Sequence, residues 1–286
     1  MWLLFALVSA LLLGVRRVYE KQLSAEFGNF SLSFATLTFS LPFTAVLLFF
    51  LALPQQWTAL SARFWGPLIV IWLVIYPVQN YFLYRSLREG ELSEVTPIGA
   101  LLPVFNIASS FVILHEVPTL VGFAGIALTV VATYLLLTDT QGFRGQRYNR
   151  PVLFMVITVA CTALGSTLDK VAIEASTPVF YSFVNVLGAS VVFLVLSYVY
   201  GEREDIKKIH RYLGTFVLLG LVFSLAFVAF TTAFTLGPTS YTLALRSGGF
   251  MLAALWGLFL LRESHSTRKI AALALFTVGS IVLALG

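Results

Sequence analysis

The sequence has 286 residues, of which 59% are hydrophobic and 11% are charged, and its mean hydropathy is +0.92. A soluble domain carries about 25% charged residues, so this chain has too little polar surface to cover itself in water, and we predict a single all-α integral membrane domain. The net charge of +5 comes from scattered basic residues, which argues against nucleic-acid binding, and the lone Cys161 excludes an internal disulfide.

Ten apolar segments follow one another along the chain. A helix needs about 20 apolar residues to cross the hydrocarbon core, and lipid favours a continuous helix that satisfies its own backbone hydrogen bonds. The first segment lacks the positive region of a cleavable signal peptide, so we expect it to be retained. The ten predicted helices span residues 2–24, 31–53, 65–87, 92–114, 118–138, 151–173, 178–200, 212–235, 238–261 and 268–285.

A polar linker at residues 139–150 separates two halves of five predicted helices each, residues 1–138 and 151–286. The halves share a weak internal repeat. The matched positions are Gly90 with Gly237, Glu116 with Glu263, Glu20-Lys21 with Asp169-Lys170, and Ser33-Phe34 with Ser182-Phe183. Because five is odd, the second copy enters the membrane from the opposite side, so we predict two inverted five-helix repeats. Secondary transporters often have this architecture and bind substrate near the midplane.

Three stretches carry a resemblance to a known family. Residues 96–105, Thr-Pro-Ile-Gly-Ala-Leu-Leu-Pro-Val-Phe, lead into a helix that ends at Glu116. Residues 244–246, Ala-Leu-Arg, lead into one that ends at Glu263, and Lys21 closes the first helix. With these features the whole chain is similar to the ten-helix EamA-like proteins of the drug/metabolite transporter superfamily. The resemblance implies a central cavity lined by helices three, four, eight and nine, alternating access, and gating by helices one and six.

The ninth predicted helix contains an arginine, Arg246, within an apolar stretch. An ionisable residue in a membrane helix is unfavourable to insert and usually faces a cavity. Thr242 lies one turn before Arg246 on the same face. The planar guanidinium suits a carboxylate or a phosphate, so we expect Arg246 and Thr242 to bind substrate. Alternatively, Arg246 snorkels to the membrane interface or ties helices together through backbone carbonyls.

Polar faces on two further predicted helices could complete the site. Thr96 and Asn106 share a face of the fourth helix, which also carries Pro103. Tyr76 and Asn80 lie one turn apart on the third helix. We therefore expect these four polar residues to shape the substrate site. Small and polar faces also serve tight helix packing in membranes, so a packing role is the alternative.

Charged residues near the ends of the first and sixth helices are candidates for gating. Lys21 lies in one cluster, and Asp169 and Lys170 form the other. Opposite charges within a turn can neutralise each other and favour burial, and a gate could make and break such pairs. Solvated helix ends are the alternative. We expect Glu116 to be structural, because it can favour the positive N-terminus of the next helix.

The basic residues divide unevenly between the two sides of the membrane. Fifteen of the eighteen lie after odd-numbered predicted helices, the exceptions being Arg63, Lys170 and Arg246. The positive-inside rule would then place both chain ends outside. The family resemblance implies cytoplasmic ends, so the sequence leaves the orientation open.

The sequence shows no nucleophile elbow, phosphate loop or metal-ligand spacing, so we expect no enzyme, no metal site and no cofactor. We predict a secondary transporter, an exporter, of a small polar or amphipathic metabolite such as an amino acid or organic anion. The alternatives are a nucleotide-sugar or phosphorylated-sugar carrier and, from another class, a membrane receptor or scaffold without flux. The expected partners are the substrate, the lipid bilayer and, as one option, a coupling proton, with no nucleic acid. We expect a monomer or weak dimer in a prokaryotic inner (plasma) membrane.

Overall fold

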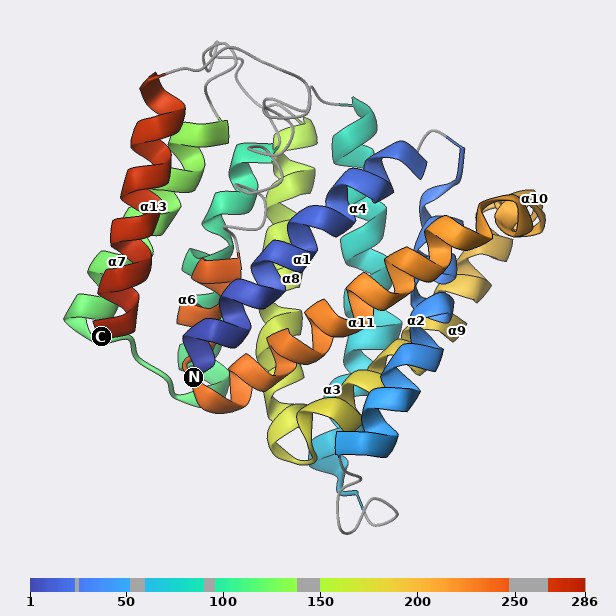
Figure 1. The fold of residues 1–286 in the computed structure, drawn as a ribbon, viewed down its shortest axis with the longest axis horizontal. Coiled ribbons are helices and arrows are strands. Elements are labelled where there is room, and N and C mark those ends of the chain that lie inside the picture. Colours follow the sequence, from blue (N-terminus) through green and yellow to red (C-terminus); the bar gives the residue numbers. More distant parts are fainter. Residues whose placement is uncertain (24–25, 52–59, 90–95, 138–149, 247–266, 286) are drawn as a thin grey trace.

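The computed structural model describes residues 1–23, 26–51, 60–89, 96–137, 150–246 and 267–285, and these ranges are helical without a β-strand (Figure 1). Each of the ten predicted segments has a helical counterpart, and the ninth is described at residues 239–246 only. The named elements are α1 (Trp2–Leu23), α2 (Asn29–Leu51), α3 (Ala62–Val70), the π-helix η2 (Ile71–Ile75), α4 (Tyr76–Glu89), the 3-10 helix η3 (Thr96–Leu101), α6 (Leu102–Leu114), α7 (Leu120–Leu137), α8 (Arg150–Glu174), α9 (Pro178–Val199), α10 (Arg203–Lys208), the 3-10 helix η4 (Ile209–Tyr212), α11 (Leu213–Leu236) and α13 (Thr267–Leu285).

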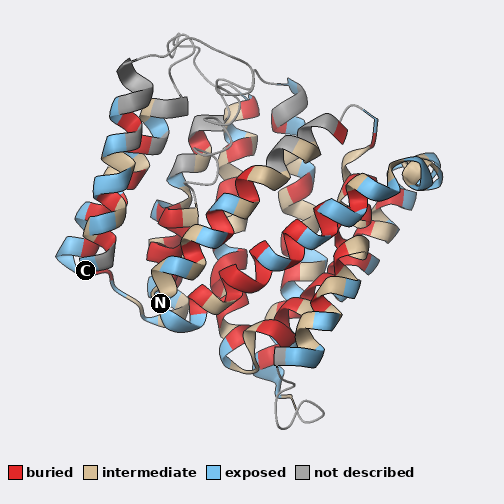
Figure 2. Cartoon of the chain, in the orientation of Figure 1, coloured by how far each residue is buried: buried red, intermediate tan, exposed pale blue. Residues whose placement is uncertain are grey.

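The outer surface of the helix bundle is suited to lipid. Among the described residues, five helical stretches are long and apolar enough to cross a membrane, and shorter apolar helices accompany them. Large apolar side chains such as Phe49, Phe50 and Leu120 are at least 77% exposed. Buried positions face the neighbouring helices instead (Figure 2). Lipid accounts for this exposure, because water would strongly disfavour so many bare aromatic and aliphatic groups.

Two of the predicted helices are not continuous α-helices, which corrects the expectation from the sequence. The third changes to π geometry before Tyr76, whose N–H bonds to the carbonyl of Ile71, five residues back. Pro77 follows and has no N–H to extend the regular ladder. The fourth begins with the 3-10 helix η3, and α6 starts at Leu102, so Pro103 occupies its first turn.

The helix packing follows the internal repeat. The sequence offset of the repeat relates α1 to α8, α2 to α9, and the α3–α4 unit to α11. In the structure α1 packs against α11, and its repeat partner α8 packs against α4 (Figure 1). The pairs α2 with α9 and α7 with α13 join repeat-related helices directly. This exchange of partners is the pattern that two inverted repeats produce.

An aromatic core lies where α2, α3, α8, α9 and α11 meet. Its buried members include Phe30, Phe64, Phe180 and Phe230, and the two halves of the chain contribute to it together. Trp72 and Tyr76 pack against this core from the third spanning segment. The core therefore holds the π turn and its polar side chains against the second half of the chain.

Candidate functional site

Five polar side chains from both halves of the chain form a continuous hydrogen-bonded group, which we name the polar row: Trp72, Tyr76, Asp169, Tyr181 and Asn185. The Asn185 amide nitrogen donates to the hydroxyl of Tyr181 at 3.0 Å and to that of Tyr76 at 3.1 Å. The indole N–H of Trp72 donates to the Asn185 amide oxygen at 2.9 Å. The Tyr181 hydroxyl donates to the Asp169 carboxylate. A buried polar network of this kind is costly unless satisfied, and here each member has a partner.

The backbone around the polar row leaves room for its large members. The indole of Trp72 lies against Gly188 on α9, where a Cβ atom would be 2.3 Å from the ring. A glycine at this position therefore lets the π turn approach α9 closely. Tyr181 is fully buried and Asp169 is 9% exposed. The carboxylate is thus held away from bulk solvent by the surrounding helices.

A line of aromatic rings on α11 borders the polar row. Two arginines from other helices pack against these rings. Phe223, Phe227, Phe230 and Phe234 follow 4,3,4 spacing and form one face of the helix, here called the aromatic face. The guanidinium carbon of Arg246 lies 3.7 Å from the centre of the Phe230 ring. That distance fits a cation–π contact. The charge of Arg246 also acts electrostatically on Asp169 and Tyr76.

The second arginine of the aromatic face is Arg16 of α1. Its guanidinium carbon lies 4.5 Å from the centre of the Phe223 ring. It also pairs with Glu20, one turn on, at 2.6 Å. Arg16 thus has an opposite charge on its own helix. The acidic residue on which Arg246 acts, Asp169, lies on another helix. Arg246 is therefore the better placed of the two arginines to bind a ligand in its place.

The remaining sequence-predicted binding residues have contacts within or between helices. Asn106 on α6 is completely buried, and its amide donates to Thr167 Oγ1 of α8 at 3.0 Å. Asn80 donates to the carbonyl of Tyr76, and Thr242 donates to that of Pro238, each within its own helix turn. The Thr96 side chain lies outside the described set. The structure thus brings Tyr76 into the polar row and Arg246 onto the aromatic face beside it, and a substrate-binding role for all six residues stays a prediction.

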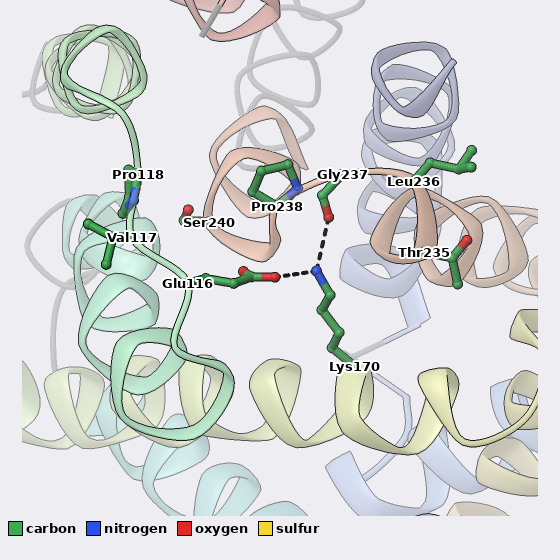
Figure 3. A pocket seen from close by; sticks show the side chains of 9 residues that line it. All are labelled: Glu116, Val117, Pro118, Lys170, Thr235, Leu236, Gly237, Pro238 and Ser240. Carbon is green, nitrogen blue, oxygen red and sulfur yellow. Dashed lines mark hydrogen bonds and ion pairs between the residues drawn. The ribbon is translucent and has the colours of Figure 1, made fainter.

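A second charged group, which we name the corner cluster, lies at one end of the bundle and consists of Lys170, Glu116, Gly237 and Thr239. The Lys170 ammonium group pairs with the Glu116 carboxylate and donates to the carbonyl of Gly237 at 3.1 Å (Figure 3). The other oxygen of Glu116 accepts the backbone N–H of Thr239 at 3.1 Å. Glu116 therefore caps the helix at residues 239–246, a partner that we did not expect from the sequence. A pocket of about 350 Å³ lies over the cluster.

The sequence-predicted gating residues have separate surroundings. Asp169 belongs to the polar row, where it contacts Tyr181 of α9, and Lys170 belongs to the corner cluster, where it contacts the connections after α6 and α11. Lys21 lies in α1, and its side chain is outside the described set. Within the described ranges, no group of three or more acidic, histidine or cysteine side chains is arranged to hold a metal ion.

Beyond the C-terminal end of α9, acidic residues in and next to α10 bind the backbone at the start of α2. We name this contact the α10 clamp. Asp205 accepts the backbone N–H of Gly28 at 2.7 Å, and Glu202 accepts that of Ser31 at 2.8 Å. Lys208 pairs with Asp205 at 2.9 Å. Burial acts to raise the pKa of Asp205, but its bonds to Lys208 and Gly28 outweigh burial and leave that pKa below the ordinary value.

Sequence reasoning missed Asn185 and Tyr181, which are central to the polar row. They lie four residues apart in a mostly apolar helix. The same spacing singled out Tyr76 and Asn80 on the third predicted helix. A search for polar pairs one turn apart in every predicted span would therefore have found them.

Known proteins that resemble this chain include a transporter family and a transporter relative. The model of the EamA-like transporter family matches residues 1–138 and 149–285. An uncharacterized transporter, YdeK of Bacillus subtilis (strain 168), is 29% identical over 126 residues, which are 44% of this chain and 42% of the relative. The aligned part therefore spans less than half of that relative. One crystal structure, described only as that of a protein, has a TM-score of 0.78 at 17% identity, over 99% of this chain and 98% of the other, and shows the same fold.

Proposed function

The chain belongs to the EamA-like transporter family, and thus to the drug/metabolite transporter superfamily of multi-pass membrane proteins, and we propose that it is a secondary exporter of a small polar or amphipathic metabolite. Amino acids and related organic anions are the proposed substrates, and a prokaryotic inner (plasma) membrane is the proposed location. The observation that carries this proposal is the polar row beside Arg246, where both halves of the chain meet. Alternating access requires a site at such an interface.

The charges at this site fit a zwitterion. The Arg246 guanidinium would bind a carboxylate through its planar fork. The Asp169 carboxylate would bind an ammonium group, and the aromatic face would cover an apolar side chain. In the structure the charge of Arg246 acts on Asp169. Substrate would replace this interaction with two opposite charges of its own, so neither protein charge is left unpaired in a low-dielectric site.

A carrier without substrate must also keep its own polar groups satisfied. The Asn185 amide bridges Tyr76 of the first half and Tyr181 of the second. A substrate that binds here would compete for these hydroxyl groups, and the halves would then be linked through the substrate. This exchange would couple occupancy to the relative position of the two halves. A proton gradient, solute exchange and facilitated flux are all compatible drives.

Counterflow in liposomes tests the proposal. Vesicles containing the purified protein are loaded with one unlabelled solute and assayed for uptake of the labelled form, across amino acids, organic anions, nucleotide sugars and phosphorylated sugars. We expect amino acids or organic anions to exchange with the wild type and not with Arg246→Gln. The matched control is Arg63→Gln, which removes an exposed arginine that pairs with Glu174 and should leave counterflow unchanged.

The other outcomes of this assay identify the rival functions. Counterflow restricted to nucleotide sugars or phosphorylated sugars would assign the related carrier function, which also needs a cation. Ligand binding without any flux would support a receptor or scaffold. Ion conduction at channel rates without solute exchange would refute the carrier proposal.

A further inference from the structure

The corner cluster joins the two halves of the chain at one end of the bundle. Glu116 belongs to the first half and follows α6, whereas Lys170, Gly237 and Thr239 belong to the second. Lys170 thus connects the end of α8 to two corners at once. In Figure 3 the Glu116 and Lys170 side chains point toward each other, and the Gly237 carbonyl faces the same ammonium group.

A second contact reinforces the same junction. The hydroxyl of Tyr241 accepts the backbone N–H of Thr119 at 3.1 Å, which ties the start of α7 to the helix at residues 239–246. Gly122 faces this hydroxyl so closely that a Cβ atom would clash with it. The corner between α6 and α7 is therefore held to α8 by an ion pair and to the helix at residues 239–246 by a tyrosine.

We propose that Lys170 and Glu116 form an ion-pair lock that closes this end of the carrier. The inference rests on the proposed carrier function, because only a protein with alternating access must open the junction between its halves. Opening this end would separate the Glu116 corner from Lys170 and Gly237. Both charges would then be exposed to water that enters through the pocket above them.

Burial distinguishes the lock from an ordinary surface ion pair. The side chain of Lys170 is 9% exposed and that of Glu116 is 24% exposed. Arg63 and Glu174 also link the two halves, at 3.2 Å, but their side chains are 64% and 40% exposed. Exposed pairs contribute little, whereas removal of one partner from a buried pair leaves an uncompensated charge. The less exposed pair is therefore assigned to the lock, and the exposed pair serves as its matched control.

Distances between spin labels on the two corners test the lock. Val117 and Leu236 lie on opposite corners, line the pocket, and are 65% and 47% exposed. Both are replaced by cysteine in a Cys161→Ala background, and the labelled protein is studied in lipid nanodiscs by dipolar spectroscopy. We expect a single short distance when the lock is intact. Lys170→Met and Glu116→Gln should each raise a longer-distance population by about tenfold, and Arg63→Gln should not.

Each result bears directly on the lock. Glu116→Gln keeps an oxygen for the Thr239 N–H, so it removes the ion pair with the least change to the fold. Unchanged distances in the folded variants would overturn the lock. Failure of Glu116→Gln to fold would also overturn it, because the pair would then be needed for folding. If the proposed carrier function were wrong, counterflow would be absent while the spin-label distances still changed in the lock variants. The two proposals can therefore fail separately.

Discussion

Asp169 and Lys170 are consecutive residues of α8, yet they belong to different regions of the molecule. The Asp169 carboxylate accepts a bond from Tyr181 in the polar row, whereas the Lys170 ammonium group pairs with Glu116 at the end of the bundle. Successive residues of a helix point about 100° apart, so one peptide step separates the two environments. Under the proposed function, the polar row would set ligand affinity and the corner cluster would control access.

The variant with the largest expected effect is Asp169→Asn, which should separate zwitterions from plain anions. The dissociation constant of an amino acid should rise on the order of 100-fold, because loss of one partner from a buried charge pair costs about 2–5 kcal/mol. An organic anion without an ammonium group should bind within about threefold of wild type. Calorimetric titration of the purified protein measures both. An equal loss for both ligands would mean that Asp169 orders the site without binding the ammonium group.

Lys170→Met should show the opposite behaviour. Ligand affinity should stay within about threefold of wild type, because Lys170 lies outside the polar row. The counterflow rate should fall about tenfold, because one end of the carrier would no longer close in each cycle. Titration and liposome counterflow on the same preparation provide the two readouts. If Lys170→Met lowered both ligand affinity and counterflow rate, the polar row and the corner cluster would not have separate roles.

The pair Asn106→Leu and Asn185→Leu compares a helix contact with the polar row. Asn106→Leu should lower the free energy of unfolding by about 1 kcal/mol, because hydrogen bonds between membrane helices are of this size, and should leave ligand affinity unchanged. Asn185→Leu should weaken ligand binding, because it disconnects Tyr76 from Tyr181. Thermal unfolding with and without ligand distinguishes the two. If Asn106→Leu abolished the ligand-induced stabilisation, Asn106 would contact substrate as the sequence predicted.

The smallest expected effect concerns the α10 clamp, at the end of α9 opposite the corner cluster. Because the pKa of Asp205 is lowered in the folded state, its contribution to stability is present above the ordinary aspartate pKa of about 3.9 and is lost as the pH falls through the lowered value. Asp205→Asn should therefore cost about 1 kcal/mol at pH 7, and this difference should shrink toward pH 3. Melting temperatures of variant and wild type at both values test it. A constant difference would mean that the charge of Asp205 is irrelevant to the clamp.

The sequence identified single residues of the candidate site more readily than their partners. Arg246 and Tyr76 were recognisable because a charge and a tyrosine near an amide stand out in apolar helices. The sequence did not indicate that Arg246 lies over Phe230, or that Lys170 meets Glu116, 54 residues earlier. Those contacts depend on how each helix rotates about its axis and crosses its neighbours.

The sequence by itself determined the ten helices, the two halves and the family resemblance. Length and hydrophobicity are local properties, and lipid forces each spanning segment to satisfy its backbone within itself. Only the tertiary structure decided which polar side chains meet. It placed Asn106 between α6 and α8, directed Glu116 to the helix at residues 239–246, and joined Asp169 to Tyr181. Side-chain partners follow from the packing of helices distant in sequence, and many such packings are compatible with one hydropathy pattern.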